Sequence, residues 1–293
     1  MNKLRILYDL IMGLYFKSKA WICITCNIKP KISKIKAENT IVSLTSYGDR
    51  LSRCAPYAIY SMFTQNVTPE KITLWIDKYK WNDSNIPFSI RRMKGWGILE
   101  INYCEDIRSY TKLLPALQKY SEKIIITIDD DLYYSKSFIK ELYEPYLKKR
   151  DNIYTYGVNI PTFYKNELLP YSDWKVNLYK QKNKIENNKN ILAYGFCGIL
   201  YPPGIFDDEI FNRHVYMKYC VTCDDIWFYI MSLRMGINKT LINSQTVHFY
   251  LIDLIYQKTN RKSCLRDINS GSGKNNDIAL SNLLSYYKLK IEL

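Results

Sequence analysis

The sequence lacks an apolar run long enough to cross a membrane. Such a helix needs roughly 20 consecutive apolar residues, and the first apolar stretch, Leu4 to Tyr15, is interrupted by Asp9 and followed by Lys17 and Lys19. No small-residue cleavage site follows it, so a secretory signal is not indicated. Apolar residues recur in the stretch with helical spacing, at Leu4, Leu7, Ile11 and Leu14. We expect a basic amphipathic helix that either lies in an anionic membrane surface or packs on its own domain.

The sequence also lacks any block of five or more consecutive basic residues, which disfavours nucleic acid as a partner. Its 42 Lys and Arg against 28 Asp and Glu nevertheless give a net charge of +14. This excess favours anionic partners such as nucleotide phosphates or lipid head groups. An apolar content of 47% over 293 residues is enough for a substantial core, so global disorder is excluded.

The eight cysteines do not form a convincing zinc motif. Two Cys-x-x-Cys pairs occur, Cys23 with Cys26 and Cys220 with Cys223, but they lie far apart in sequence and lack flanking Gly turns. Without a secretory signal, the thiols are expected to be reduced. This predicts a cytoplasmic protein, peripheral on the inner face of the plasma membrane if the first helix binds lipid.

From residue 41 onward, strand and helix patterns alternate. Strand-like runs recur about every 25 to 30 residues, the length of one βαβ unit. They are Ile41–Thr45, Ile72–Ile76, Ile98–Tyr103, Ile124–Ile128 and Ile153–Val158. Helices are expected between them at Pro56–Gln65, Ile86–Lys94, Tyr110–Tyr120 and Ser135–Lys149. The alternation predicts an α/β fold with a mostly parallel sheet flanked by helices.

The second half of the chain is less regular. Pro161–Asn190 is expected to be an irregular insertion, and Ser270–Asn276 a flexible loop. Order is expected to return at Ala193–Tyr201, a last strand is predicted at Thr240–Val247, and helices are predicted at Ile226–Met235 and Asp277–Tyr287. We expect three parts: a basic N-terminal segment and linker (1–38), a catalytic domain (39–250), and a C-terminal loop and helix (251–293).

Three consecutive acids follow the most apolar strand. Ile124–Ile128 has no polar alternation, as in a central parallel strand covered on both faces. Asp129, Asp130 and Asp131 cannot lie inside it, because unpaired buried charge is expensive, so they should lie at its carboxyl end, where open α/β sheets bind ligands. There the outer carboxylates can hold a divalent cation, Mn2+ or Mg2+, whose free positions bind phosphate oxygens.

Several stretches in this order resemble bacterial polysaccharide glycosyltransferases related to glycosyltransferase family 2, which have the GT-A fold. They are SLTSYGDRL (43–51), SMFTQNVTPEKITLWID (61–77), DIRSYTKLLPAL (106–117), IIITIDDDLYY (124–134), GILYPPG (198–204), CDDIWF (223–228) and NDIAL (276–280). The chain departs from the family by having Asp224-Asp225 where Glu-Asp is common. It also lacks the arginine-and-tryptophan signature of processive members.

The resemblance and the residues together predict a donor site. Thr45, Ser46 and Tyr47 follow the first strand, where hydroxyls and backbone amides can hold a base and ribose. Asp77 ends the second strand, and the resemblance implies that it accepts the ring N–H of a uracil. Asp129 and Asp130 are expected to contact the donor as well. A capping or solvated role is the alternative for Thr45–Tyr47 and Asp77.

Arg108 and Lys112 are expected on one helix face, at i, i+4 spacing, near the diphosphate. Lys112 matches the family's lysine. The alternative is a solvated basic face.

Asp224 and Asp225 begin an apolar helix, where N-capping would explain one acid. An inverting sugar transfer also needs a carboxylate that removes the acceptor's proton. Because the second acid matches the family's base, we predict that Asp225 is catalytic, with Asp224 beside it.

His248 follows the last predicted strand. GT-A enzymes sometimes complete the metal shell with a late histidine, so His248 is a candidate ligand with Asp129 and Asp131, although a lone histidine is more often structural.

These features predict a metal-dependent, inverting hexosyltransferase that moves a sugar from a nucleotide diphosphate sugar, favoured to be a UDP-sugar, to a surface-glycan or lipid-linked acceptor of capsule, O-antigen or lipooligosaccharide. A nucleotidyltransferase is the alternative enzyme, but the Gly-rich phosphate loop expected after its first strand is missing. A non-catalytic membrane or nucleic-acid adaptor would leave both acidic clusters without a purpose.

Overall fold

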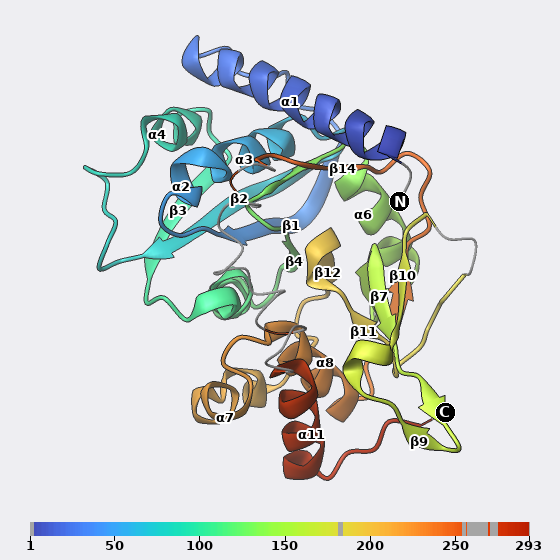
Figure 1. Cartoon of the computed structure of the whole chain (residues 1–293). Coiled ribbons are helices and arrows are strands. Elements are labelled where there is room, and N and C mark those ends of the chain that lie inside the picture. Colours follow the sequence, from blue (N-terminus) through green and yellow to red (C-terminus); the bar gives the residue numbers. More distant parts are fainter. Residues whose placement is uncertain (1–2, 181–183, 254–255, 257–268, 270–274, 293) are drawn as a thin grey trace.

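The computed structural model describes residues 3–180, 184–253, 256, 269 and 275–292. A seven-stranded sheet runs through its centre in the order β13-β6-β12-β4-β1-β2-β3. All neighbouring pairs are parallel except those of β12, which is antiparallel to both β4 and β6. This confirms the predicted α/β class with a mostly parallel central sheet flanked by helices (Figure 1).

The parallel half of the sheet follows the predicted strands closely. Its strands are β1 (Lys36–Thr45), β2 (Thr68–Asp77), β3 (Leu99–Cys104) and β4 (Ile124–Thr127). Between them lie α2 (Arg50–Arg53), α3 (Ala55–Phe63), α4 (Phe88–Lys94), the 3-10 helix η1 (Arg108–Lys112) and α5 (Leu114–Lys119). The predicted boundary at residue 38 therefore falls inside β1.

The second half of the sheet differs more from expectation. The run Ile153–Val158 divides into β6 (Ile153–Thr155) and β7 (Gly157–Ile160), and only Lys239–Leu241 forms β13. The run 193–201 contributes β11 (Leu192–Ala193), η3 (Gly195–Cys197) and the antiparallel β12 (Ile199–Tyr201). A short strand β5 (Leu132–Tyr134), which the sequence did not predict, precedes α6 (Phe138–Lys148) and pairs with β14 (Phe249–Leu251).

The insertion is more regular than predicted. Residues 161–190 contain a hairpin of β8 (Phe163–Tyr164) and β9 (Glu167–Leu168), the 3-10 helix η2 (Tyr171–Asp173), and β10 (Lys175–Leu178). β10 and β11 flank β7 in a small antiparallel sheet. In the described part of the chain after β12, the helices are η4 (Asp208–Phe211), α7 (Arg213–Tyr219), α8 (Asp224–Arg234) and α11 (Asn275–Tyr287). Most of the loop predicted at Ser270–Asn276 lies outside the described residues.

Apolar side chains of β4 fill two cores, one on each face of the sheet. Ile124, Ile126 and Ile128 join a core with α3, α4 and α6, whereas Ile125 joins the core with α5, α7, α8 and α11. This is the period-2 alternation of a strand, with both faces covered as predicted. Cys23 packs against the first core and Cys220 and Cys223 belong to the second, so the two Cys-x-x-Cys pairs cannot share a metal ion.

The predicted N-terminal helix is α1 (Lys3–Thr25), which lies along the outside of the α2–α4 layer and extends well past Tyr15 (Figure 1). Its inner side packs on the domain: Phe16 stacks on Tyr133 with ring centroids 4.6 Å apart, and Ala20 and Ile24 are buried. Among the described residues, no helix combines the length and apolar character needed to span a bilayer.

Candidate active site

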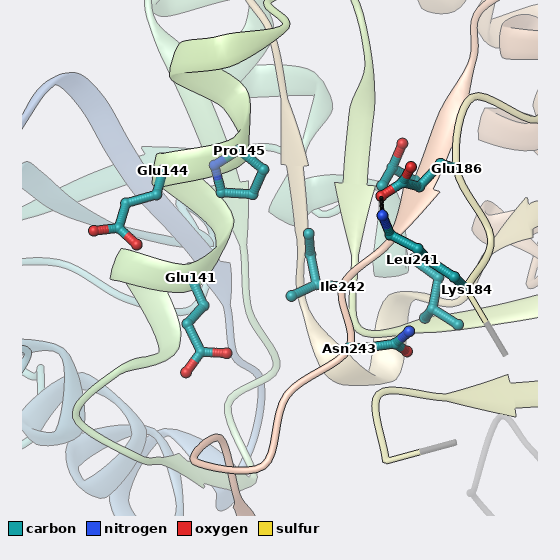
Figure 2. Close-up of a pocket in the computed structure, with 9 residues that line it drawn as sticks. Glu141, Glu144, Pro145, Lys184, Glu186, Leu241, Ile242 and Asn243 are labelled. Carbon is teal, nitrogen blue, oxygen red and sulfur yellow. Dashed lines mark ion pairs between the residues drawn. The ribbon is translucent and has the colours of Figure 1, made fainter. Parts of the chain in front are cut away.

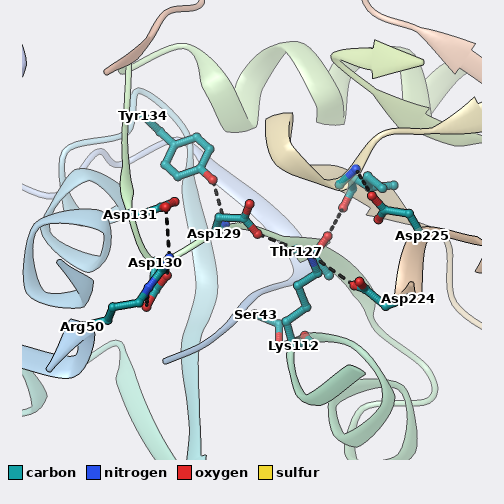
Figure 3. Close-up of polar contacts among 12 residues, drawn as sticks. Ser43, Arg50, Lys112, Thr127, Asp129, Asp130, Asp131, Tyr134, Asp224 and Asp225 are labelled. Carbon is teal, nitrogen blue, oxygen red and sulfur yellow. Dashed lines mark hydrogen bonds and ion pairs between the residues drawn. The ribbon is translucent and has the colours of Figure 1, made fainter. Parts of the chain in front are cut away.

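The three consecutive acids lie in the turn that follows β4, at the carboxyl end of the parallel strands, as predicted. β4 ends at Thr127, and β5 begins at Leu132. The backbone N–H of Asp129 donates a hydrogen bond of 2.8 Å to the hydroxyl of Tyr134, which closes the turn. Three adjacent acids are thereby held at the sheet edge rather than inside the strand (Figure 3).

Arg50, at the start of α2, holds two of these acids. Its Nε donates to Asp130 Oδ2 at 3.1 Å, and its NH2 group contacts both Asp130 Oδ1 and Asp131 Oδ2, the latter at 3.0 Å. Ser46, in the loop after β1, adds a hydrogen bond of 2.5 Å to Asp130 Oδ2. Asp130 is buried and fully engaged, so its main role is to tie the loop after β1 to the acidic turn.

Lys112 connects the acidic turn to the second acidic pair. Its Nζ lies 3.3 Å from Asp129 Oδ1 and 3.5 Å from Asp224 Oδ2 (Figure 3). Ser43 Oγ donates to the backbone carbonyl of Lys112 at 2.6 Å, which fixes the end of η1 against β1. Burial lowers the pKa of the Lys112 ammonium, but Asp129, Asp224 and Asp225 outweigh it and raise the pKa well above the ordinary value. The lysine is therefore charged.

Asp224 and Asp225 are the first two residues of α8, whose N-cap residue Cys223 makes no side-chain capping bond. Asp225 Oδ2 accepts a hydrogen bond of 3.3 Å from the backbone N–H of Gly195. A Cβ on Gly195 would lie only 2.6 Å from Asp225 Oδ1 and 3.2 Å from Lys112 Nζ, so glycine permits this close approach. Burial, followed by the charge of Asp224, raises the pKa of Asp225 to about 7.

The whole cluster carries an excess of negative charge. Five carboxyl groups, at residues 129, 130, 131, 224 and 225, are linked by two cations, Arg50 and Lys112. Burial is the main cause that raises the pKa of Asp129, and it raises that of Asp131 to about 6. Burial, with repulsion between the neighbouring carboxylates, therefore outweighs the effect of the two cations on these acids.

Among the described residues, no group of three or more His, Cys, Asp or Glu side chains is arranged to hold a metal ion unaided. Mg2+, however, is usually held by one or two carboxylates together with substrate phosphates. Asp129 and Asp131 lie in one turn between β4 and β5 and offer carboxylate oxygens, the donor type that this shared binding uses.

His248 lies at the other end of β5 from Asp131, so the structure gives no support to the prediction that it completes the metal shell of these acids. β14 runs antiparallel to β5, so Ile252 N–H bonds to the carbonyl of Asp131 while His248 bonds to Ser135 at the opposite end. Four extended residues separate these ends, about 13 Å along the strand. The His248 ring instead contacts Lys180, whose Nζ lies 3.0 Å from Nδ1.

Arg108 and Lys112 do not share a helix face. Arg108–Lys112 is a 3-10 turn, in which residues three rather than four apart align. Arg108 is exposed and has a positive φ of 61°, whereas Lys112 points into the site.

The other predicted donor residues surround the first two strand ends. Thr45 Oγ1 donates to the Trp75 carbonyl at 2.9 Å, a bond between β1 and β2. Tyr47 is exposed and its ring faces the Arg50 guanidinium, 5.5 Å from the ring centroid. Asp77 Oδ1 accepts from the backbone N–H of Tyr79 at 3.0 Å, so it supports its own turn. These contacts fit the capping alternative and leave base recognition as a prediction.

Sequence reasoning assigned no role to Arg50, Ser43, Tyr134 or Gly195. Arg50 lies in the motif SYGDRL, and its position as a basic residue just after the first strand was the signal that could have identified it. The bond of Tyr134 spans five residues but lies beside a strand that pairs with distant β14, and the bond of Gly195 joins residues 30 positions apart, so the local pattern gave no signal for either.

A separate pocket lies between α6 and β13 (Figure 2). It is lined by Glu141, Glu144, Pro145, Lys184, Glu186 and residues 240–243. None of the five clustered carboxylates lines it, so it is distinct from the site described above.

Comparison with known proteins gives distant similarities. No protein-family model matches the chain. UvrABC system protein B of Francisella tularensis subsp. tularensis is 23% identical over 135 residues, which cover 40% of this chain and 20% of that protein. Staphylococcus aureus TarS 1–349 in complex with UDP has a TM-score of 0.47 and 10% identity, covering 72% of this chain and 59% of that chain.

TarS 1–349 in complex with UDP-GlcNAc gives a TM-score of 0.47 at 10% identity, covering 72% of this chain and 57% of that chain. A further structure of TarS 1–349 gives 0.45 at 12% identity, covering 87% and 75%. The chain thus spans about a fifth of the curated relative and less than two thirds of TarS in its UDP and UDP-GlcNAc complexes. These similarities assign the chain to no named family.

Proposed function

We propose that this protein is a metal-dependent glycosyltransferase of the GT-A type, related to family 2, that transfers a sugar from a nucleotide diphosphate sugar to a glycan acceptor with inversion. One observation carries the proposal: the single ammonium of Lys112 contacts both the acidic turn after β4 and the acidic pair that begins α8. Asp225, whose pKa is raised, is the neighbour of Asp224 in that pair, so a cation for a diphosphate and a candidate base belong to one cluster.

On the donor side, Lys112 would exchange part of its contact with Asp129 for the donor's phosphate oxygens, because an ammonium binds phosphate as a point charge. Asp129 and Asp131 would hold Mn2+ or Mg2+, which supplies positive charge against the charge that develops on the leaving diphosphate. Arg50 fixes the geometry of the acidic turn through Asp130 and Asp131. We take the donor to be a UDP-sugar, as the sequence resemblance implies.

On the acceptor side, Asp225 would take the proton of the attacking hydroxyl. The Gly195 N–H orients its carboxylate, and a pKa of about 7 suits a general base near neutral pH. Asp224 instead pairs with Lys112, so the two acids have different partners. We place the acceptor among surface glycans or lipid-linked glycans of capsule, O-antigen or lipooligosaccharide.

The first test is donor binding and hydrolysis. Mn2+ together with the correct nucleotide sugar should raise the melting temperature, since a ligand at 100 times its Kd stabilises the native state by about 2.7 kcal/mol. Chelator should remove both this shift and the release of free sugar. The measurement is a thermal-shift screen of UDP-, GDP- and CMP-sugars with Mn2+ or EDTA, followed by donor hydrolysis.

Asp131→Ala should lose the metal-dependent shift, whereas Asp83→Ala, which removes an exposed surface acid, should keep it. Unchanged hydrolysis in excess chelator would remove the metal from the proposal. Pyrophosphate release from a nucleoside triphosphate would indicate a nucleotidyltransferase, and no turnover with any metal would favour a non-catalytic adaptor.

Gly195→Ala should damage catalysis through Asp225. The new Cβ would displace the Asp225 carboxylate, and a shift of about 1 Å at a reacting group can lower the rate about 10²-fold. The measurement is sugar transfer by Gly195→Ala alone and in an Asp225→Asn background. If the glycine acts only through Asp225, the alanine should add little further loss in that background; fully additive losses would contradict this link.

A further inference from the structure

The outer side of α1 exposes a large apolar surface. Leu14 is 62% exposed and Trp21 is 56% exposed. The other large exposed side chains of this helix are Tyr8, Ile11, Tyr15 and Ile22. Large contiguous apolar surfaces on a folded protein mark interaction sites, because leaving them in water is unfavourable.

The helix is built into the domain by its opposite side. A Cβ on Gly13 would lie 2.6 Å from the carbonyl oxygen of Leu251, so the helix backbone lies directly against β14. Lys17 forms an ion pair of 3.1 Å with Asp253. α1 therefore presents its outer side in a fixed orientation relative to the rest of the molecule (Figure 1).

The positive charge on and beside α1 indicates which class of partner this surface binds. Between Asp9 and Glu38 the sequence contains six lysines and no acid. Five of them are exposed: Lys19, Lys29, Lys31, Lys34 and Lys36. A second copy of the chain would bring like charges together, whereas an anionic lipid surface would attract each lysine.

The apolar residues fit the same partner. Tyr and Trp side chains favour the boundary between lipid head groups and acyl chains, and lysines extend their charged ends to the head groups. Ile28 and Ile35, in the segment after the helix, are also exposed. Because α1 is not apolar enough to cross a bilayer, a helix lying in the plane of the membrane surface is the geometry that remains.

We propose that the outer side of α1, together with the basic segment 26–36, docks the protein on a bilayer rich in anionic phospholipid. This interaction does not depend on the proposed catalytic function. The same face would bind vesicles whether or not the carboxylate cluster transfers a sugar.

The test is vesicle flotation of the full chain with phosphatidylcholine alone and with added phosphatidylglycerol. Wild type should bind the anionic vesicles and dissociate as salt is raised, because exposed charges are screened. Leu14→Ser/Trp21→Ser should weaken binding about tenfold or more. Lys19→Glu/Lys29→Glu should do the same, mainly at low salt.

The matched control is Ile278→Ser/Tyr286→Ser on α11, which packs on the opposite face of the sheet and whose two side chains are similarly exposed. It should bind like wild type, and melting temperatures of all variants show whether they fold. The proposal fails if wild type ignores anionic vesicles at low salt, or if the control loses as much binding. It also fails if light scattering without lipid shows a dimer that Leu14→Ser/Trp21→Ser dissociates.

Discussion

Asp225→Asn is expected to lower turnover by about 10²- to 10⁴-fold, the usual cost of removing a positioned general base. Asparagine keeps the size of the side chain and an oxygen that can accept the Gly195 N–H, so donor affinity should change little. In wild type, activity should fall as pH decreases through about 7, because the base must be ionised. Transfer kinetics across this pH range and donor calorimetry measure both effects.

Asp224→Asn is the control for this prediction. Asp224 pairs with Lys112, so its replacement should disturb donor binding more than the proton transfer. If Asp225→Asn keeps near wild-type turnover, or Asp224→Asn is the more damaging change in turnover, the assignment of the base is wrong. A product of retained configuration would remove the need for such a base.

The same substitution should stabilise the fold at alkaline pH. The pKa of Asp225 is raised in the folded state, so the folded protein retains a proton that the unfolded chain loses as pH rises above the ordinary value of 3.8. The cost to stability therefore grows between about pH 4 and pH 7 and stays constant above that range. Without ligand, Asp225→Asn should melt higher than wild type at pH 8 and about equally at pH 4.

Lys112→Met is expected to be the most destabilising of the proposed site variants. Removing one member of a buried ionic group typically costs about 3–5 kcal/mol, because the other charges remain buried. The loss should be smaller at pH 5 than at pH 8, since Asp225 is protonated at the lower pH and no longer needs a cation. Urea denaturation at both pH values measures this difference, and calorimetry should show weaker donor binding.

Lys119→Met supplies the matched control. Lys119 contacts Glu100 at the surface, where an ion pair contributes at most about 1 kcal/mol. If both lysine variants lose equal stability, Lys112 does not stabilise the buried carboxylates more than a surface ion pair would.

The sequence predicted the position of a strand or helix correctly where the local pattern of apolar residues matches their burial in the structure. The apolar run Ile124–Ile128 indicates a strand covered on both faces. The three acids that follow it must therefore lie at the end of that strand. Likewise, Asp224 and Asp225 precede a long apolar helix, so their position at its N-terminus was predictable.

Non-local pairing explains what could not be predicted. Leu132–Tyr134 lies between the acids and the predicted helix Ser135–Lys149, so its local pattern did not indicate a strand. It forms one because residues 249–251, more than a hundred positions later, pair with it. The direction of that pairing places His248 away from Asp131. The bonds of Arg50 and Gly195 to the acids also join segments distant in sequence, which a local pattern cannot reveal.

The position of α1 also has a consequence for how the chain is made. Its inner side packs on Tyr133 and on β14 as well as on α3 and α4, so its docking is complete only after residues near 250 have been synthesised. At about 5–20 residues per second this delay lasts on the order of 10–50 s. Throughout that interval the part of the inner side that packs on Tyr133 and β14 lacks its full partners, so substitutions in β14 should increase aggregation through this helix.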